Sequence, residues 1–266
     1  MPPPSIPSPD EGLAHVPTLA RLRAVELVGK LGLGYLGQVF SAAEILTAIM
    51  GHGLGPGDRF VLSPSHYVTA MYAVAAELGM LDEKLLSTYG VDGSDLETIG
   101  SERTPIVDFT CGSLAQGLSV GIGYTLASRL AASGARTFVF GSDGEMEEGQ
   151  TWEAAMFAGH HGLKDLTLTL DCNDSQVDGP VSSITTIEPV AARWETFGWT
   201  AIEVDGHDTA ALIDALDSPT DRPKVIVART TATATLDALG DLDDAHFIKI
   251  DDELRKSLSD ELAGRL

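Results

Sequence analysis

This sequence is poor in the features on which several protein classes depend. It has two cysteines, Cys111 and Cys172, among 266 residues, so we expect reduced thiols and no disulfide framework. Its apolar stretches are strand-sized or are interrupted by glycine and charge, so no membrane span is expected. Residues 1–17 carry six prolines and no apolar core, which predicts a flexible tail and not a signal peptide. We therefore expect a cytoplasmic protein.

Basic residues are also scarce. The chain has 17 Lys and Arg against 39 Asp and Glu, a formal net charge of −22. Phosphate contacts need cationic side chains, so neither nucleic acid nor an anionic membrane is an expected partner. No G-x-G-x-x-G or G-x-x-x-x-G-K-[ST] motif follows the first expected strand, which argues against a monomeric nucleotide-binding domain. A diphosphate bound by so acidic a chain would need a divalent cation to mediate the contact.

Short apolar strands alternate with helices after the tail, and this alternation is typical of a parallel sheet covered on both faces. We predict one α/β domain over residues 18–266, a three-layer α/β/α arrangement with a mainly parallel sheet. Residues 233–245 are expected to form a loop. The expected strands are 60–62, 137–140, 166–171, 200–204 and 225–228, and the expected helices are 18–31, 41–50, 67–79, 114–132, 152–161, 189–197, 209–216 and 251–262.

Two polar residues stand directly after two of these strands, Asp143 in G-S-D-G-E and Asn173 in D-C-N. Ligands of open α/β sheets bind at the carboxyl ends of the strands. Mg²⁺ prefers oxygen ligands, which the Asp143 carboxylate, the Asn173 amide and a backbone carbonyl near Ser175 could supply. Gly144 lets the backbone approach a phosphate closely. An ordinary strand-to-helix turn with a capping Asp would give the same short pattern.

The flanking residues resemble the cofactor-binding segments of the transketolase family. The resemblance covers roughly residues 18–262 and only the family's amino-terminal, diphosphate-binding domain. It implies a thiamine diphosphate-binding (PP-type) domain, with thiamine diphosphate and Mg²⁺ as cofactors, in the first subunit of a split transketolase. The segments that carry it, in family order, are SAAEIL (41–46), DRFVLS (58–63), GSLAQGLS (112–119), GSDGEMEEGQTWEAA (141–155), DCNDSQVDGP (171–180), WETFGW (194–199) and VDGHD (204–208).

The resemblance also implies roles for single residues. His66 aligns with a catalytic histidine close to the diphosphate and the reacting carbons, and such a histidine can donate a hydrogen bond. Glu148 aligns with a glutamate that meets the glutamate of the pyrimidine-binding domain and helps to couple the active sites. His207, in a turn, is expected to be structural. The implied cofactor-binding residues are His66, Gly112, Ser113, Leu114, Ser142, Asp143, Gly144, Glu145, Asn173 and His246, and the implied metal ligands are Asp143, Asn173 and Ser175.

The expected partner is a C-terminal transketolase subunit that carries the pyrimidine-binding domain, because this chain has no segment that resembles that domain. The simplest symmetric assembly is a heterotetramer of two copies of each chain. Two alternatives stay open. A 2-oxo acid dehydrogenase-type α-subunit shares the D-G…N pattern but not the flanking segments, and a catalytically degenerate subunit could act as a scaffold.

The chain departs from the family pattern at positions that face the substrate. Tyr35 and Ile99 stand where the family has histidines, and residues 230–235 lack two family lysines. Ile99 cannot bond a ketose hydroxyl, and each unpaired buried hydroxyl costs about 1–3 kcal/mol. We therefore expect transfer of a two-carbon ketol or related acyl unit from a ketose-type donor to an aldehyde-type acceptor, with a non-standard substrate in specialised metabolism.

Overall fold

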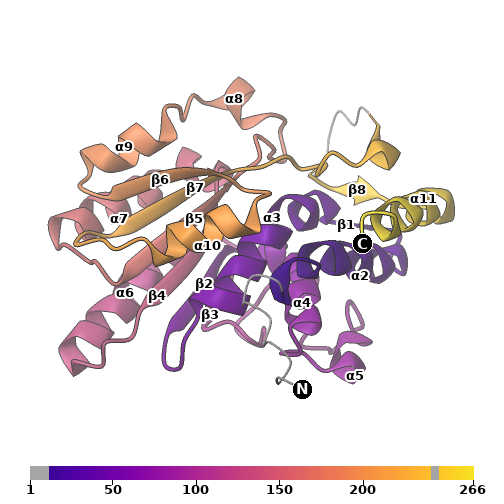
Figure 1. The fold of residues 1–266 in the computed structure, drawn as a ribbon, viewed down its shortest axis with the longest axis horizontal. Coiled ribbons are helices and arrows are strands. Elements are labelled where there is room, and N and C mark those ends of the chain that lie inside the picture. Colours follow the sequence, from indigo (N-terminus) through magenta and orange to yellow (C-terminus); the bar gives the residue numbers. More distant parts are fainter. Residues whose placement is uncertain (1–11, 241–245) are drawn as a thin grey trace, which may run out of the picture.

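The computed structural model describes residues 12–240 and 246–266, and a six-stranded parallel sheet lies at its centre (Figure 1). The strand order is β3-β2-β4-β5-β7-β6, with helices on both faces. The predicted three-layer α/β/α fold with a mainly parallel sheet is confirmed. The strands are β2 (Arg59–Pro64), β3 (Phe109–Cys111), β4 (Thr137–Ser142), β5 (Leu166–Cys172), β6 (Thr200–Asp205) and β7 (Lys224–Arg229).

Two hydrophobic cores lie on the two faces of this sheet, because successive side chains of a strand point to opposite sides. In β4, Phe138 and Phe140 join one core and Val139 joins the other. The first core is closed by α2 (Val16–Gly29), α3 (Leu36–Ala48), α4 (Val68–Glu77) and α10 (Thr209–Asp217). The second core is closed by α6 (Gln116–Ala131), α7 (Gly149–His160) and α9 (Val190–Thr196).

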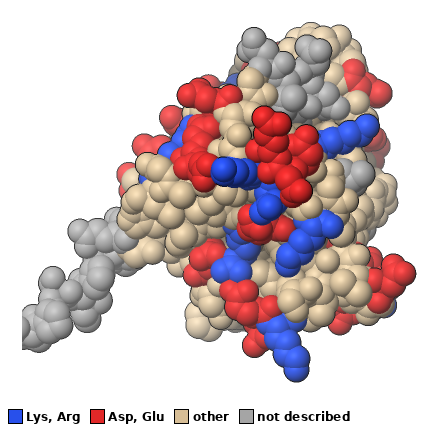
Figure 2. All heavy atoms as spheres, turned by 90° about the vertical axis from the view of Figure 1, so that its right-hand side faces the viewer, with Lys and Arg blue, Asp and Glu red and all other residues tan. Residues whose placement is uncertain are grey.

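Smaller elements complete the domain at its carboxyl-terminal end. Helix α11 (Asp252–Ala263) packs against α2, and β1 (Leu33–Gly34) pairs antiparallel with β8 (Ile248–Lys249). Two one-turn helices, α5 (Glu83–Leu86) and α8 (Val181–Ile184), lie in connecting segments. On the face that Figure 2 shows, acidic and basic side chains are interspersed, and pairs such as Arg255 with Glu26 join α11 to α2.

The predicted elements are all present, with shifted ends. Helix α2 begins two residues before the predicted start at Thr18, and residues 1–11 of the predicted tail lie outside the described part. Helix α3 begins five residues before the predicted start at Ser41. The predicted loop 233–245 contains a 3-10 turn at Asp237–Leu239, and its last five residues are not described. Among the described residues, no helix is long and apolar enough to cross a membrane.

Candidate cofactor site

The structure brings Asp143 and Asn173 together at the carboxyl ends of two neighbouring strands. Strands β4 and β5 run parallel, and Ser142 pairs with Asp171, so the two chains leave the sheet side by side. The Asp143 carboxylate accepts hydrogen bonds from the backbone N–H of Gly144 at 2.9 Å and of Asp174 at 2.7 Å. Asp143 and Asn173 are 2% and 7% exposed. Both side chains are therefore held in place before any ligand is considered.

A buried carboxylate behind this pair fixes the orientation of the Asn173 amide. Asp171 accepts hydrogen bonds from Ser41 Oγ at 2.5 Å, from Tyr67 Oη at 2.9 Å and from Thr230 Oγ1. The Asn173 Nδ2 group donates to Asp171 Oδ2 at 3.0 Å. Its Oδ1 atom accepts from the N–H of Ser175 at 2.9 Å and keeps a second lone pair. The amide nitrogen therefore faces Asp171, and the amide oxygen remains available to a ligand.

The Asp143 carboxylate fits a divalent cation. Burial, together with the nearby charge of Asp171, raises the pKa of Asp143 to about 8. No ion pair to Asp143 exists among the described residues, and a bound cation would keep the group ionised. Among the described residues, no group of three or more His, Cys, Asp or Glu side chains is arranged to hold a metal ion by itself. An oxygen set from one carboxylate, one amide, backbone and phosphate suits Mg²⁺.

A cleft of about 760 Å³ opens beside these strand ends. Two groups of its lining residues bear on the site. One group belongs to the strand ends and their turns, and comprises Ser142, Gly144, Ser175 and Gln176. The other group is aromatic or aliphatic apart from its two histidines, and comprises Tyr35, His66, Ile99, His246 and Phe247. Gly112, Leu114 and Glu148 also line the cleft, whereas four other residues of the predicted site, Ser113, Asp143, Glu145 and Asn173, are not among the lining residues.

The two predicted site histidines lie next to each other although 180 residues separate them. The ring centroids of His66 and His246 are 5.2 Å apart. Burial, reinforced by the neighbouring His246, lowers the pKa of His66 to about 3, so its imidazole is neutral near pH 7. Gln38 Nε2 lies 2.8 Å from His246 Nδ1.

Glu145 does not line the cleft, and its predicted place among the cofactor-binding residues stays a prediction. Its carboxylate is 4% exposed and accepts from Ser63 Oγ at 2.5 Å, from the Ala115 N–H at 2.7 Å and from the Ser142 N–H at 3.2 Å. Ala115 has a positive φ of 64° at the start of α6. Glu145 therefore holds the turn that presents Gly112 and Leu114 to the cleft.

Glu148, unlike the buried Glu145, lies at the surface. It is exposed, stands at the N-cap position of α7 and lines the cleft at its rim. Glu145 and Glu148, three positions apart in the sequence, are thus a buried supporting carboxylate and an accessible one. The predicted catalytic, cofactor-binding and metal-binding roles, including that of a Ser175 carbonyl, stay predictions.

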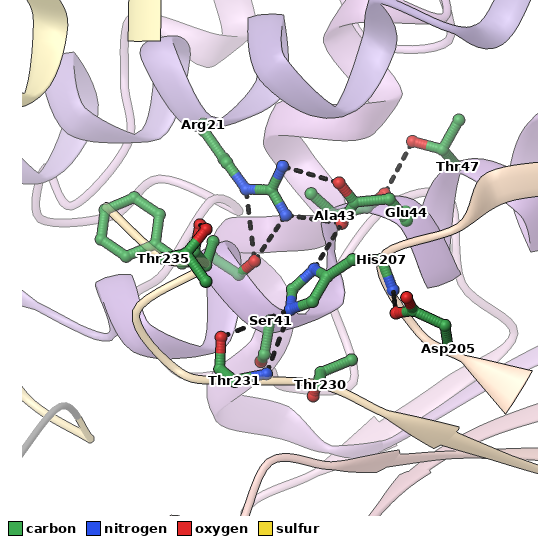
Figure 3. Close-up of polar contacts among 12 residues, drawn as sticks. Arg21, Ser41, Ala43, Glu44, Thr47, Asp205, His207, Thr230, Thr231 and Thr235 are labelled. Carbon is green, nitrogen blue, oxygen red and sulfur yellow. Dashed lines mark hydrogen bonds and ion pairs between the residues drawn. The ribbon is translucent and has the colours of Figure 1, made fainter. Parts of the chain in front are cut away.

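A second polar network ties the loop after β7 to the helices (Figure 3). Arg21 donates to both carboxylate oxygens of Glu44, at 2.7 and 2.5 Å. His207 Nδ1 lies 3.4 Å from Glu44 Oε2, and His207 Nε2 accepts from the Thr231 N–H at 3.1 Å. His207 therefore bridges α3 to the segment that follows β7, in agreement with the structural role predicted for it.

These features define a cofactor-binding α/β domain, and comparison with known proteins gives its family. The family described as "Transketolase, thiamine diphosphate binding domain" matches residues 16–259, so the chain belongs to the transketolase family. This family membership argues against the alternative of a 2-oxo acid dehydrogenase-type α-subunit.

Several relatives match over most of their length. The chain is 36% identical over 215 residues to the 6-deoxy-6-sulfo-D-fructose transketolase subunit SqwG of Clostridium sp., covering 77% of this chain and 78% of that protein. It is 30% identical over 223 residues to an apulose-4-phosphate transketolase subunit of Phocaeicola vulgatus, covering 79% of each.

The solved transketolases are longer. The crystal structure of transketolase from Campylobacter jejuni superposes with a TM-score of 0.83 at 24% identity, over 95% of this chain and 43% of that chain. This likeness supports the fold, and this chain spans less than half of that protein.

Proposed function

We propose that this chain is the thiamine diphosphate-binding subunit of a Mg²⁺-dependent, transketolase-like transferase. The observation that carries the proposal is the pairing of Asp143 and Asn173 at adjacent strand ends, with the Asn173 amide oxygen left available to a ligand. When bound, thiamine diphosphate supplies a nucleophilic carbon for the transfer of a two-carbon ketol or related acyl unit. Asp143 and Asn173 would hold the metal and, through it, the diphosphate.

The other residues of the cleft supply positioning. His66 is neutral near pH 7, so it can donate one hydrogen bond to a substrate or phosphate oxygen without adding charge. His246 belongs to the same group of lining residues, and its ring lies next to that of His66. Gly112 and Leu114 are held by the Glu145 contacts and form part of the wall.

We further propose that a partner subunit with the pyrimidine-binding domain completes this site. Exposed apolar side chains line the cleft: Leu114 is 37%, Val177 74%, Ile184 48% and Phe247 39% exposed. Such a patch marks an interaction surface, and Glu148 stands beside it with its carboxylate free to meet a group from the partner. Relatives named as transketolase subunits match this chain over similar lengths. A heterotetramer with two copies of each chain is the simplest arrangement.

Calorimetry tests the proposal. Thiamine diphosphate with Mg²⁺ is titrated into this chain alone and into the chain co-purified with the product of the neighbouring gene. We expect binding in the co-purified complex, and we expect Asp143→Ala to weaken it at least about 100-fold, the upper range of single metal-site losses. Asp178→Ala is the matched control, because Asp178 lines the same cleft but is exposed and stands in the turn after β5. An unchanged titration for Asp143→Ala, or no binding to the complex, would favour the scaffold alternative.

A further inference from the structure

One part of the cleft has a chemistry that the cofactor does not explain. Tyr35 packs against Phe247, with ring centroids 4.9 Å apart and planes at 72°. Its ring also lies 5.3 Å from His66 and 5.7 Å from His246, again between centroids. Ile99 lines the same cleft with a branched aliphatic side chain. We call Tyr35, Ile99 and Phe247 the apolar wall.

The charge of the cleft lining is one-sided. The described lining residues include Glu147, Glu148 and Asp178, and none of them is Lys or Arg. His66 adds no positive charge near pH 7, because burial lowers its pKa to about 3. A phosphorylated substrate would therefore find repulsion, and no cationic partner, on this side of the site.

A polyhydroxylated chain is also a poor match for the apolar wall. Each hydroxyl moved from water against Ile99 or Phe247 loses hydrogen bonds that an aliphatic or phenyl group cannot replace. The edge-to-face arrangement of Tyr35 and Phe247 instead offers ring faces and edges to another aromatic group. The histidines provide the few polar contacts that an aldehyde oxygen and the newly formed hydroxyl require.

We propose, on the basis of the proposed function, that the apolar wall selects a neutral aldehyde acceptor with an aromatic or branched aliphatic skeleton. Tyr35 and Ile99 are then the specificity-determining residues of this chain. In the transfer, the donor's bond between its carbonyl carbon and the adjacent carbinol carbon breaks, and the donor remainder leaves as an aldehyde after losing its hydroxyl proton. A new carbon–carbon bond forms to the acceptor aldehyde carbon, whose oxygen takes up a proton. No net oxidation occurs.

The test uses the co-purified complex with thiamine diphosphate, Mg²⁺ and a fixed ketose donor, L-erythrulose. Acceptors are benzaldehyde and 3-methylbutanal against D-erythrose and D-erythrose 4-phosphate. We expect kcat/KM for the apolar aldehydes to exceed that for the sugars by about ten-fold or more, the scale on which apolar pockets discriminate. The Tyr35→His/Ile99→His double variant should reduce this ratio by about ten-fold or more. Asp221→Asn is the control, because Asp221 is exposed and does not line the cleft, and it should leave the ratio unchanged.

A binding experiment without donor separates the two proposals. Ligand-observed NMR compares 2-phenylethanol with erythritol on the same complex loaded with thiamine diphosphate. Stronger saturation of 2-phenylethanol, lost in the double variant, supports the apolar wall even if L-erythrulose is not a donor. Equal or stronger saturation of erythritol overturns it, as does a kinetic preference for D-erythrose 4-phosphate. Absence of cofactor binding refutes the proposed function instead. If the double variant does not fold, Ile99→Asn alone should shift both readouts in the same direction.

Discussion

Replacing Arg21 with methionine tests the network shown in Figure 3. Arg21 donates to Glu44 with both terminal nitrogens and to the Phe40 carbonyl, and both charged side chains are at least nine-tenths buried. Methionine fills a similar volume without the charge, so the main loss is the partner of a buried carboxylate. Breaking a buried pair in this way costs about 3–5 kcal/mol. We expect Arg21→Met to lower the free energy of unfolding by that amount.

Guanidinium unfolding followed by circular dichroism measures the effect. Arg255→Met is the matched control. Its partner Glu26 lies on α2, the helix that carries Arg21, but this pair is at the surface, where a salt bridge contributes about 0–1 kcal/mol. Adding Glu44→Leu to Arg21→Met should restore about half or more of the loss, since no unpaired charge remains. A loss below about 1 kcal/mol for Arg21→Met would refute the reasoning, because it would place the pair among surface salt bridges.

The same pair sets a pH dependence with a definite sign. Burial alone would raise the pKa of Glu44, but the hydrogen bond with His207 and the charge of Arg21 hold it below the usual value of 4.5. A carboxylate with a lowered pKa in the folded state stabilises fully above its unfolded pKa and loses this contribution as the pH falls through the folded value. In Arg21→Met the buried Glu44 lacks the charge of Arg21, so its pKa rises and its protonation relieves the unpaired charge. The difference in unfolding free energy between the wild type and Arg21→Met should therefore be largest at neutral to alkaline pH and should shrink as the pH falls toward and below 4.5.

Three further predictions concern α6, the cleft and the metal. Gly117→Ala should destabilise the protein by about 1–3 kcal/mol in thermal or chemical unfolding, because a Cβ at Gly117 would lie 2.4 Å from the Cβ of Ser63. Gly123→Ala on the same helix is the control, because a Cβ at Gly123 meets nothing within 4 Å, and it should be neutral or stabilising by up to about 1 kcal/mol. In the wild type, His66 binds a proton below pH 6.5 when the chain is unfolded but only below about pH 3 when it is folded, so stability falls with pH in this range. His66→Gln should make the decrease of unfolding free energy with falling pH less steep. An unchanged dependence on pH would contradict the lowered pKa of His66. EDTA should abolish calorimetric binding of thiamine diphosphate to the complex and Mg²⁺ should restore it, whereas binding that persists in EDTA would remove the role proposed for Asp143.

The fold was predictable where hydrophobic periodicity is strong, and less so where elements are short or wholly buried. All five predicted strands of the sheet are present, but β3 has three residues and gives too little pattern to detect. Helix α3 began earlier than predicted because all its residues from Leu36 to Ala48 are buried. Such a helix shows no polar face, and Tyr35 before it makes no side-chain cap that would mark the start.

The positions of candidate site residues were predictable where a residue type follows a strand, as for Asp143 and Asn173. The supporting carboxylates were harder to assign, because sequence spacing does not say which way a side chain points. Glu145 belongs to the G-S-D-G-E motif, yet its side chain faces Ser63. The sequence marks Asp171 only as the last residue of a predicted strand. One feature of the sequence could have marked Asp171 as a supporting residue: it is a charged residue at the end of an otherwise apolar run. Its partners lie up to 130 residues away, so only the fold could identify them.

The bonds to Asp171 have a consequence for the energetics of ligand capture. Four segments meet at this one carboxylate, through Ser41, Tyr67, Asn173 and Thr230, and they are held together by the fold itself. An Asn173 side chain free to rotate would lose about 0.5–1.5 kcal/mol of conformational entropy on ordering each time a ligand bound. Here that entropy is already lost when the chain folds, so the oxygen is aimed before the ligand arrives. Loosening Asp171 should therefore slow productive capture, even where every atom that touches the ligand is unchanged.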